Sequence, residues 1–234
     1  MSNDMEPQDE FDRALIASAF TLAGEHGWHR MSVTEAARHA GLKLDRARAR
    51  CPSRLALLAR FGRMADRAAL AETPTEGPVR DRLFQLLMRR LDVLAAHRAG
   101  VLALLHALPA DPPLALWLAL ANRRSMRWMA EAAGVSTHGL AGELRLKGLV
   151  GVWLWTVRAW TADESADLSP SMAALDTALG RAERMAGWLR LGAAATPPTA
   201  EPQDVGAAEP HDTGAAAPQD EGAAAPPEAP AAPV

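Results

Sequence analysis

Residues 28–54 read WHRMSVTEAARHAGLKLDRARARCPSR, and this stretch decides the fold. Its apolar spacing predicts a helix that ends in a tight turn at Gly41, followed by a second, short helix. That second helix carries four basic residues, Lys43, Arg46, Arg48 and Arg50. This is the layout of a helix-turn-helix, in which the second helix enters the DNA major groove. The stretch therefore predicts a DNA-binding head.

Capping residues mark where the neighbouring helices begin. Ser32-Val33-Thr34-Glu35 fits a capping box, in which Ser32 accepts from the amide of Glu35 and Glu35 reaches back. Pro52 stops the short basic helix, and Ser53 caps the next one. Helical periodicity continues almost to residue 191, and strand-like alternation is rare, so we predict an all-α fold. Nine helices are expected, at about residues 11–25, 32–40, 44–50, 53–71, 79–96, 99–108, 113–133, 137–161 and 170–191.

The two ends of the chain differ in composition from its middle. Residues 1–10 are polar and acidic. Residues 193–234 repeat with a period of eight (EPQDVGAA, EPHDTGAA, APQDEGAA) and contain seven acidic residues but no Lys or Arg. Such segments cannot bury enough apolar surface to offset the entropy of ordering. Both ends are therefore predicted to be disordered.

The net charge of −3 hides a basic patch. Without residues 193–234 the chain is positive, at +4. Residues 30–67 hold ten Lys or Arg against Glu35, Asp45 and Asp66, a local charge of +7. A clustered basic surface of this kind is typical of proteins that bind phosphate groups.

Several classes of protein are disfavoured by what the sequence lacks. Cys51 is the only cysteine, the N-terminus has no secretory signal, and no stretch approaches the length of an apolar membrane span. A cytoplasmic protein without stable membrane insertion is expected. The histidines have no zinc-site spacing, and no nucleophile–base pair or phosphate-binding loop is visible. We therefore expect no metal, no cofactor and no enzyme activity.

The head and the helical body together resemble the TetR family of transcriptional regulators. The matching residues are Ala17, Ala23, Gly27, Ser32, Val33, Ala36, Ala40, Gly41, Leu42, Ser53, Leu57 and Leu58. The resemblance implies a DNA-binding head over 11–71 and a body over 79–191 that dimerises and holds a small ligand. It also implies that ligand binding releases the DNA. Thr34 would contact phosphate, the segment from Lys43 to Arg50 would form the recognition helix, and Arg54 would replace a phosphate-contacting lysine.

The recognition helix departs from the pattern of that family. Arg48 stands where the family usually has a tyrosine, and Cys51 stands in place of a phenylalanine. Asp45 replaces a small residue; it suits the helix dipole but would repel phosphate.

A second resemblance concerns the body. It looks like the ubiquinone-biosynthesis accessory proteins, which share the TetR fold but bind isoprenoid lipid instead of DNA. The matching segments are 80–82, 107–109, 133–137 and 144–149. Residues 138–142, HGLAG, lack that family's acidic and aromatic stretch. This resemblance implies an alternative function, lipid binding without DNA recognition.

The body contains a helix segment that is apolar on all sides, GLVGVWLWTV at 148–157. Such a segment must be covered all round. We favour a homodimer interface formed with the last helix, with Val150, Leu154, Val157, Leu175, Leu179 and Met185 as its residues. The alternative is an apolar ligand pocket lined by Trp117, Met126, Trp128, Met129, Trp153 and Trp160.

The sequence thus predicts a homodimeric regulator, a repressor released from double-stranded DNA by a small apolar ligand. Lys43, Arg46 and Arg48 are expected at bases or nearby phosphates, because arginine pairs well with guanine edges. Arg50 and Arg54 are expected at phosphates.

Overall fold

The computed structural model describes residues 6–188, and this part of the chain is all-helical, as predicted. The helices are α1 Glu6–His26, α2 Val33–His39, α3 Leu44–Arg50, α4 Arg54–Leu70, α5 Val79–Ala95, α6 Arg98–Ala107, α7 Pro112–Ala132, α8 Gly139–Thr161 and α9 Ser169–Trp188. A single 3₁₀ turn, η1 Leu108–Ala110, joins α6 to α7. The predicted tail, 193–234, lies outside the described residues.

The helix starts follow the predicted caps. Ser32 Oγ accepts a hydrogen bond of 3.1 Å from the amide of Glu35, and Ser53 Oγ accepts one of 3.2 Å from the amide of Ala56. Asp111 lies between two predicted helices, and it caps α7 by accepting a hydrogen bond from the amide of Leu114 at 3.0 Å. These bonds satisfy amides that have no partner within their own helix.

The prediction of disorder for residues 1–10 is wrong over 6–10, where α1 already runs from Glu6. Asp9 in this first part of α1 pairs with Arg67 of α4 at 3.3 Å. Polar composition alone suggested disorder, whereas the segment continues a helix whose later residues are buried.

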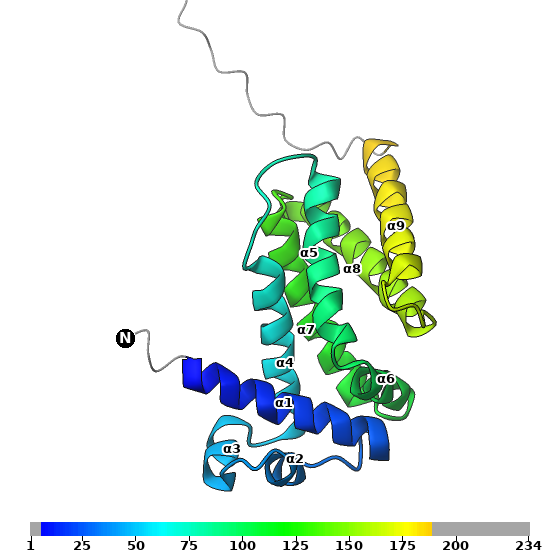
Figure 1. The fold of residues 1–234 in the computed structure, drawn as a ribbon. Coiled ribbons are helices and arrows are strands. Elements are labelled where there is room, and N and C mark those ends of the chain that lie inside the picture. The colour runs from blue at the N-terminus through cyan, green and yellow to red at the C-terminus, as the bar shows by residue number, and fades with distance from the viewer. Residues whose placement is uncertain (1–5, 189–234) are drawn as a thin grey trace, which may run out of the picture. The chain divides into compact units, whose positions relative to one another are not determined.

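The head is formed by α1, α2 and α3 together with the first part of α4. Phe11, Leu15, Ala19, Phe20 and Ala23, the predicted apolar face of α1, are all buried. Figure 1 shows α1 lying between the body and the pair α2–α3, while α4 rises from the head into the body. Ala36 and Ala37 of α2 and Ala47 of α3 supply the small buried side chains against which α1 packs.

The head joins the body where α1 crosses α6. A Cβ at Gly100 of α6 would collide with the backbone of Phe20, so only glycine fits at this crossing. Phe20 also contacts Phe61 of α4 with tilted rings, whose centroids are 4.4 Å apart, and both rings contact His97 between α5 and α6. Head and body therefore share one hydrophobic core.

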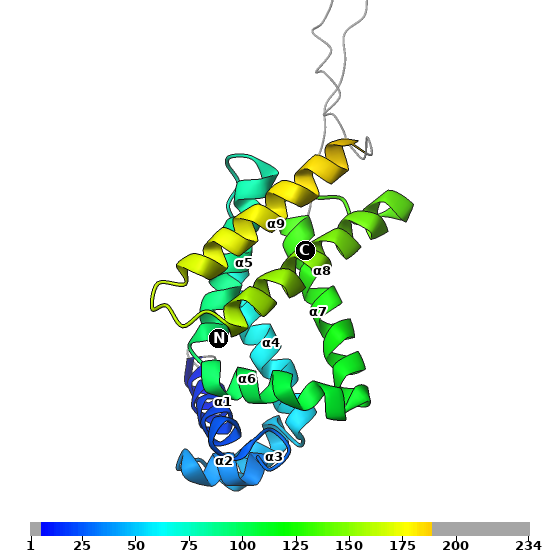
Figure 2. The same cartoon turned by 90° about the vertical axis from the view of Figure 1, so that its right-hand side faces the viewer.

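The body consists of α5 to α9 and the upper part of α4. Helices α8 and α9 pack along each other, and Figure 2 shows this pair beside α5 and α7. Leu146, Leu149, Val152, Trp153 and Trp160 of α8 face the core.

Candidate nucleic-acid interface

The turn between α2 and α3 has the geometry of a helix-turn-helix. Gly41 adopts φ +65°, a left-handed conformation that glycine accepts without steric cost. The amide of Leu42 donates to the carbonyl of Ala37 at 2.8 Å, which closes the end of α2. Ala47 and Cys51 then turn inward, exposed by only 2% and 1%. The face of α3 opposite these two residues, with Asp45 and Ala49, is left to solvent.

Cys51 packs in the head core, at the position where the resemblance to the TetR family implied a phenylalanine. Burial raises the pKa of its thiol, so the side chain is a neutral, apolar filler. The substitution therefore preserves the inward face of α3.

Four of the predicted DNA-contacting residues lie on the surface: Thr34 on α2, Lys43 just before α3, and Arg46 and Arg48 on α3. Arg46 places its guanidinium 4.4 Å from the centre of the Phe11 ring, on the side of α3 that faces α1. Arg48 points from the other side of α3 and makes no hydrogen bond or ion pair with any described residue. Lys43 and Arg48 are thus exposed basic residues whose side chains make no hydrogen bond or ion pair with any described residue.

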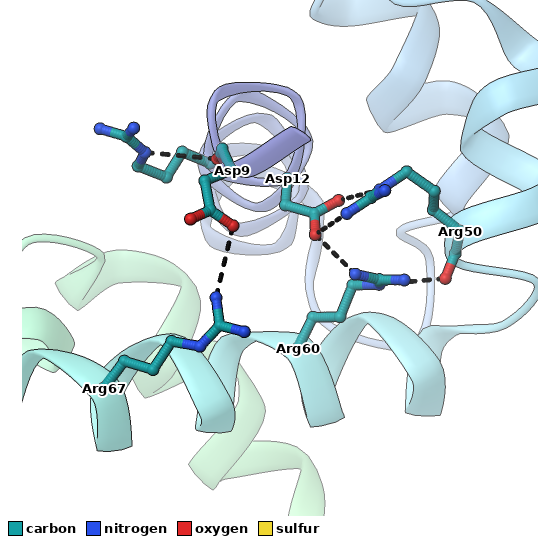
Figure 3. A network of polar contacts seen from close by, with 6 residues as sticks. Asp9, Asp12, Arg50, Arg60 and Arg67 are labelled. Carbon is teal, nitrogen blue, oxygen red and sulfur yellow. Dashed lines mark hydrogen bonds and ion pairs between the residues drawn. The ribbon is translucent and has the colours of Figure 1, made fainter. Parts of the chain in front are cut away.

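Arg50, predicted to contact phosphate, is instead engaged within the head. Its Nε and Nη2 donate to the two carboxylate oxygens of Asp12 at 2.6 and 2.7 Å. Arg60 of α4 donates to the same carboxylate at 2.6 Å and to the carbonyl of Arg50 at 3.0 Å (Figure 3). The Arg50 side chain is 20% exposed, so α3 is tied by it to α1 and α4.

The electrostatics of this cluster are those of a tight ion pair. Burial would raise the pKa of Asp12, but the hydrogen bond from Arg50 and the charges of Arg60 and Arg50 outweigh it and lower the pKa. The hydrogen bond to Asp12 raises the pKa of Arg50. The local charge expected for residues 30–67 is therefore partly neutralised by α1, which contributes Asp9 and Asp12 from outside that window.

Arg54 also has a partner inside the head. Its Nη1 donates to the backbone carbonyls of Trp28 and His29, at 3.2 and 2.8 Å. The side chain thereby holds the turn before α2 against the start of α4, the turn that also carries Arg30. Arg30 in this turn and Arg38 on α2 are exposed and were not among the predicted contacts. Their basic character was visible in the sequence, but their exposure was not.

Comparison with known proteins gives a fold but no close relative. No protein-family model and no curated protein matches the chain. Among solved structures, a TetR transcriptional regulator from Nitrosomonas europaea ATCC 19718 is similar at 21% identity and a TM-score of 0.61. The alignment covers 74% of this chain and 98% of that chain. A TetR-family transcriptional regulator from Streptomyces coelicolor is similar at 18% identity and a TM-score of 0.52, covering 76% of this chain and 83% of that one.

This chain has the TetR fold. The predicted architecture, a three-helix head on a helical body, is confirmed. Both similar proteins are transcriptional regulators.

The six predicted pocket residues differ in how deeply the described part of the body buries them. Met126, Met129, Trp153 and Trp160 are buried in the core, whereas Trp117 is half-buried. Trp128 is 57% exposed on the outside of α7, which corrects the prediction for this residue. A surface hollow of about 330 Å³ does involve Trp160, but its other lining residues are mainly polar, such as Arg98 and Asp163.

A buried polar cluster crosses the body close to Trp153. Asp66 of α4 pairs with Arg90 of α5 and accepts from Ser125 Oγ of α7 at 2.8 Å. The Arg90 guanidinium lies 5.5 Å from the Trp153 ring centre, and burial lowers its pKa to about 10. Sequence reasoning missed this cluster because its three polar members come from three different helices.

The predicted dimer residues divide into two groups. Leu175 and Leu179 are 0% and 4% exposed within a single subunit, which corrects the prediction that they form an interface. Leu154 and Met185 are 57% and 64% exposed, and Val150 and Val157 are half-buried. Only the second group is available to another chain.

The structure shows neither a metal-binding group nor a single membrane-spanning helix within residues 6–188. No group of three or more His, Cys, Asp or Glu residues in this part of the chain is arranged to hold a metal ion. No single helix there is long and apolar enough to span a membrane; α5 and α6 with η1 reach that length only together, across a bend of 93°.

Proposed function

We propose that this chain is a DNA-binding transcriptional regulator that acts as a repressor and inserts α3 of each head into a major groove. The observation that supports the proposal is that α3 is held firmly on one side and exposes basic residues on the other. Its inward face is buried through Ala47 and Cys51, and its backbone is tied to α1 and α4 through Arg50. Lys43 and Arg48 remain at the surface. A rigid, exposed, basic recognition helix is what groove binding requires.

The roles of the basic residues follow from their partners. We assign Arg48 and Lys43 to the DNA, with Thr34 at a phosphate and Arg46 at the flank of the groove. Arg50 and Arg54 hold the head together through Asp12 and through the carbonyls before α2. Arg50 and Arg54 therefore contribute to DNA binding indirectly, because they hold α3 in position.

The experiment is a gel-shift titration with DNA from upstream of the gene. The double variant Lys43→Ala/Arg48→Ala is expected to bind at least several-fold more weakly, and its affinity should depend less steeply on salt. Arg124→Ala, which removes an exposed arginine from α7 in the body, is the matched control and should bind like the parent. Binding that is indifferent to sequence and abolished by moderate salt would contradict the proposal.

We also propose that the regulator is a homodimer built on the outer face of α8. Leu144, Gly148, Gly151, Leu154 and Trp155 are exposed and lie on one face, as their spacing of three and four residues requires. A Cβ at Gly148 or Gly151 would meet no atom within 4 Å, so packing within the subunit does not require these glycines. Each glycine costs about 1 kcal/mol of helix stability relative to alanine. Close packing against a second α8 would explain why glycines occupy these two positions despite this cost.

Release by a small apolar ligand is the third part of the proposal. Met126, Met129 and Trp153 form an adaptable apolar core in the body. Helix α4 touches the Trp153 region through Asp66 and Arg90, and it touches the head through Arg60. A ligand that displaces α4 in the body would thus move the head. A repressor role predicts less transcription from a bound promoter when the protein is added, and recovery when the ligand is added.

A further inference from the structure

The central outward residue of α3 is an acid. With about 3.6 residues per turn, Asp45 and Ala49 lie one turn apart on the face opposite the buried Ala47. Both are exposed. Asp45 makes no hydrogen bond or ion pair with any other residue between 6 and 188. The outward face of α3 therefore carries a carboxylate that no other residue in the described part of the chain pairs with.

The basic side chains lie on either side of this acid and do not cover it. Arg46 turns toward α1, over Phe11, and Arg50 is held by Asp12 on the same side. Arg48 lies on the opposite side, three residues after Asp45, without pairing to it. The reading face thus consists of a central acid with a cation beside it.

A carboxylate in this place repels phosphate and lowers affinity for every DNA sequence. The carboxylate increases affinity only where the groove offers a hydrogen-bond donor, because an ionised carboxylate accepts hydrogen bonds but cannot donate them. In the major groove the amino group of cytosine, N4, is the donor that Asp and Glu accept from. Asp45 belongs to the first turn of α3, the part of a recognition helix that meets base edges.

We propose that Asp45 is a specificity-determining residue that accepts a hydrogen bond from cytosine N4 in each half-site. The inference rests on the proposed DNA-binding function and adds which base the acid selects. It also explains why an acid is tolerated on a basic surface. The carboxylate penalises all sequences, and the cytosine contact restores binding for the correct one only, which is selection by repulsion as well as by attraction.

The test compares the base preferences of the full-length protein, Asp45→Asn and Asp45→Ala, each selected from the same random DNA library. The parent should prefer cytosine at one position of each half-site by about 5- to 150-fold. Asp45→Ala should lose that preference, keep the preferences at other positions and bind non-specific DNA more tightly. Asp45→Asn should shift the preference at that position toward adenine, because asparagine pairs with adenine N6 and N7.

The control is Asp92→Asn, which removes an exposed acid from α5 in the body and should leave the selected sequence unchanged. If the parent selects a defined site and both Asp45 variants select the same site with uniformly higher affinity, Asp45 merely repels and the inference is overturned. If the parent itself selects no site, the proposed function fails and the inference fails with it. Thermal melting of the variants should fall only slightly, since Asp45 has no side-chain partner to lose within residues 6–188 and loses only its favourable interaction with the dipole of α3.

Discussion

At the scale of single residues, the head depends on which arginines are bound by acids. Asp12 takes up two guanidinium groups, those of Arg50 and Arg60, with its side chain only 14% exposed. Asp9, one turn earlier, pairs with Arg67 at the surface, where the two side chains are 48% and 74% exposed. Removing one partner of an ion pair that is shielded from water costs more stability than removing one partner of an exposed pair, because a partly buried charge is left uncompensated.

We therefore predict unequal effects for two similar substitutions on α1. Asp12→Ala should destabilise the protein by about 2 kcal/mol, because it leaves two partly buried guanidinium groups without their charged acceptor. Asp9→Ala, the matched control, should change stability by less than about 0.5 kcal/mol. Urea unfolding followed by circular dichroism measures both. Equal effects would show that the Asp12 cluster does not hold the head.

At the scale of helices, the turn from α8 to α9 is built around one carboxylate. Asp163 is 4% exposed and accepts from the amides of Ser165 and Ser171, at 2.9 and 3.0 Å, and from both hydroxyl groups. Burial alone would raise its pKa, but the four hydrogen bonds outweigh this and lower the pKa to about 2. The start of α9 is thereby fixed against the end of α8.

The pKa of Asp163 gives a prediction with a definite sign. A folded-state pKa of about 2, below the unfolded value of about 3.9, means that ionised Asp163 stabilises the fold above pH 4. This contribution is lost as the pH falls toward 2. Asp163→Ala should therefore be less stable than the parent at pH 6, and the difference should shrink between pH 4 and pH 2.

Urea midpoints measured at closely spaced pH values provide the check. A difference between parent and Asp163→Ala that stays constant from pH 6 to pH 2 would mean that the carboxylate charge does not stabilise the turn. Asp176→Ala is a suitable control, because this acid pairs with Arg80 on the exposed side of α9 and its side chain is 58% exposed.

At the scale of the whole molecule, the outer face of α8 is the surface on which we propose that two chains assemble. Two glycines in the middle of a long helix, Gly148 and Gly151, face open space in the subunit. Leu154 and Trp155 continue the same face and are 57% and 51% exposed. Exposed apolar surface of this kind is typical of faces that bind another chain.

Gly151→Leu should separate assembly from folding. Within the subunit a side chain has room at this position, and leucine favours the helix, so the subunit should be at least as stable as the parent. The added side chain would block a closely packed second α8 and convert dimers to monomers in sedimentation experiments. Gly62→Leu on α4, where a Cβ also meets nothing within 4 Å, should leave the dimer intact. A Gly151→Leu protein that remains dimeric would place the interface elsewhere.

The sequence by itself determined the elements of this protein. Capping at Ser32 and Ser53, the left-handed turn at Gly41 and the apolar face of α1 all follow from neighbours within a few positions along the chain. Local interactions of this kind leave periodic patterns that can be read without a structure. The helix-turn-helix and the all-α fold were predictable for this reason.

The tertiary structure alone decided what the long and the large side chains do. Arg50 meets Asp12 from 38 positions away, and a basic residue on a helix looks the same whether it faces DNA or an acid of the same chain. Leu175 and Leu179 continue an apolar pattern, and that pattern cannot say whether the covering surface belongs to the same subunit or to a second one. Which residue a side chain contacts depends on how segments that are far apart in the sequence pack together. The helical periodicity of a sequence does not show which of these segments meet.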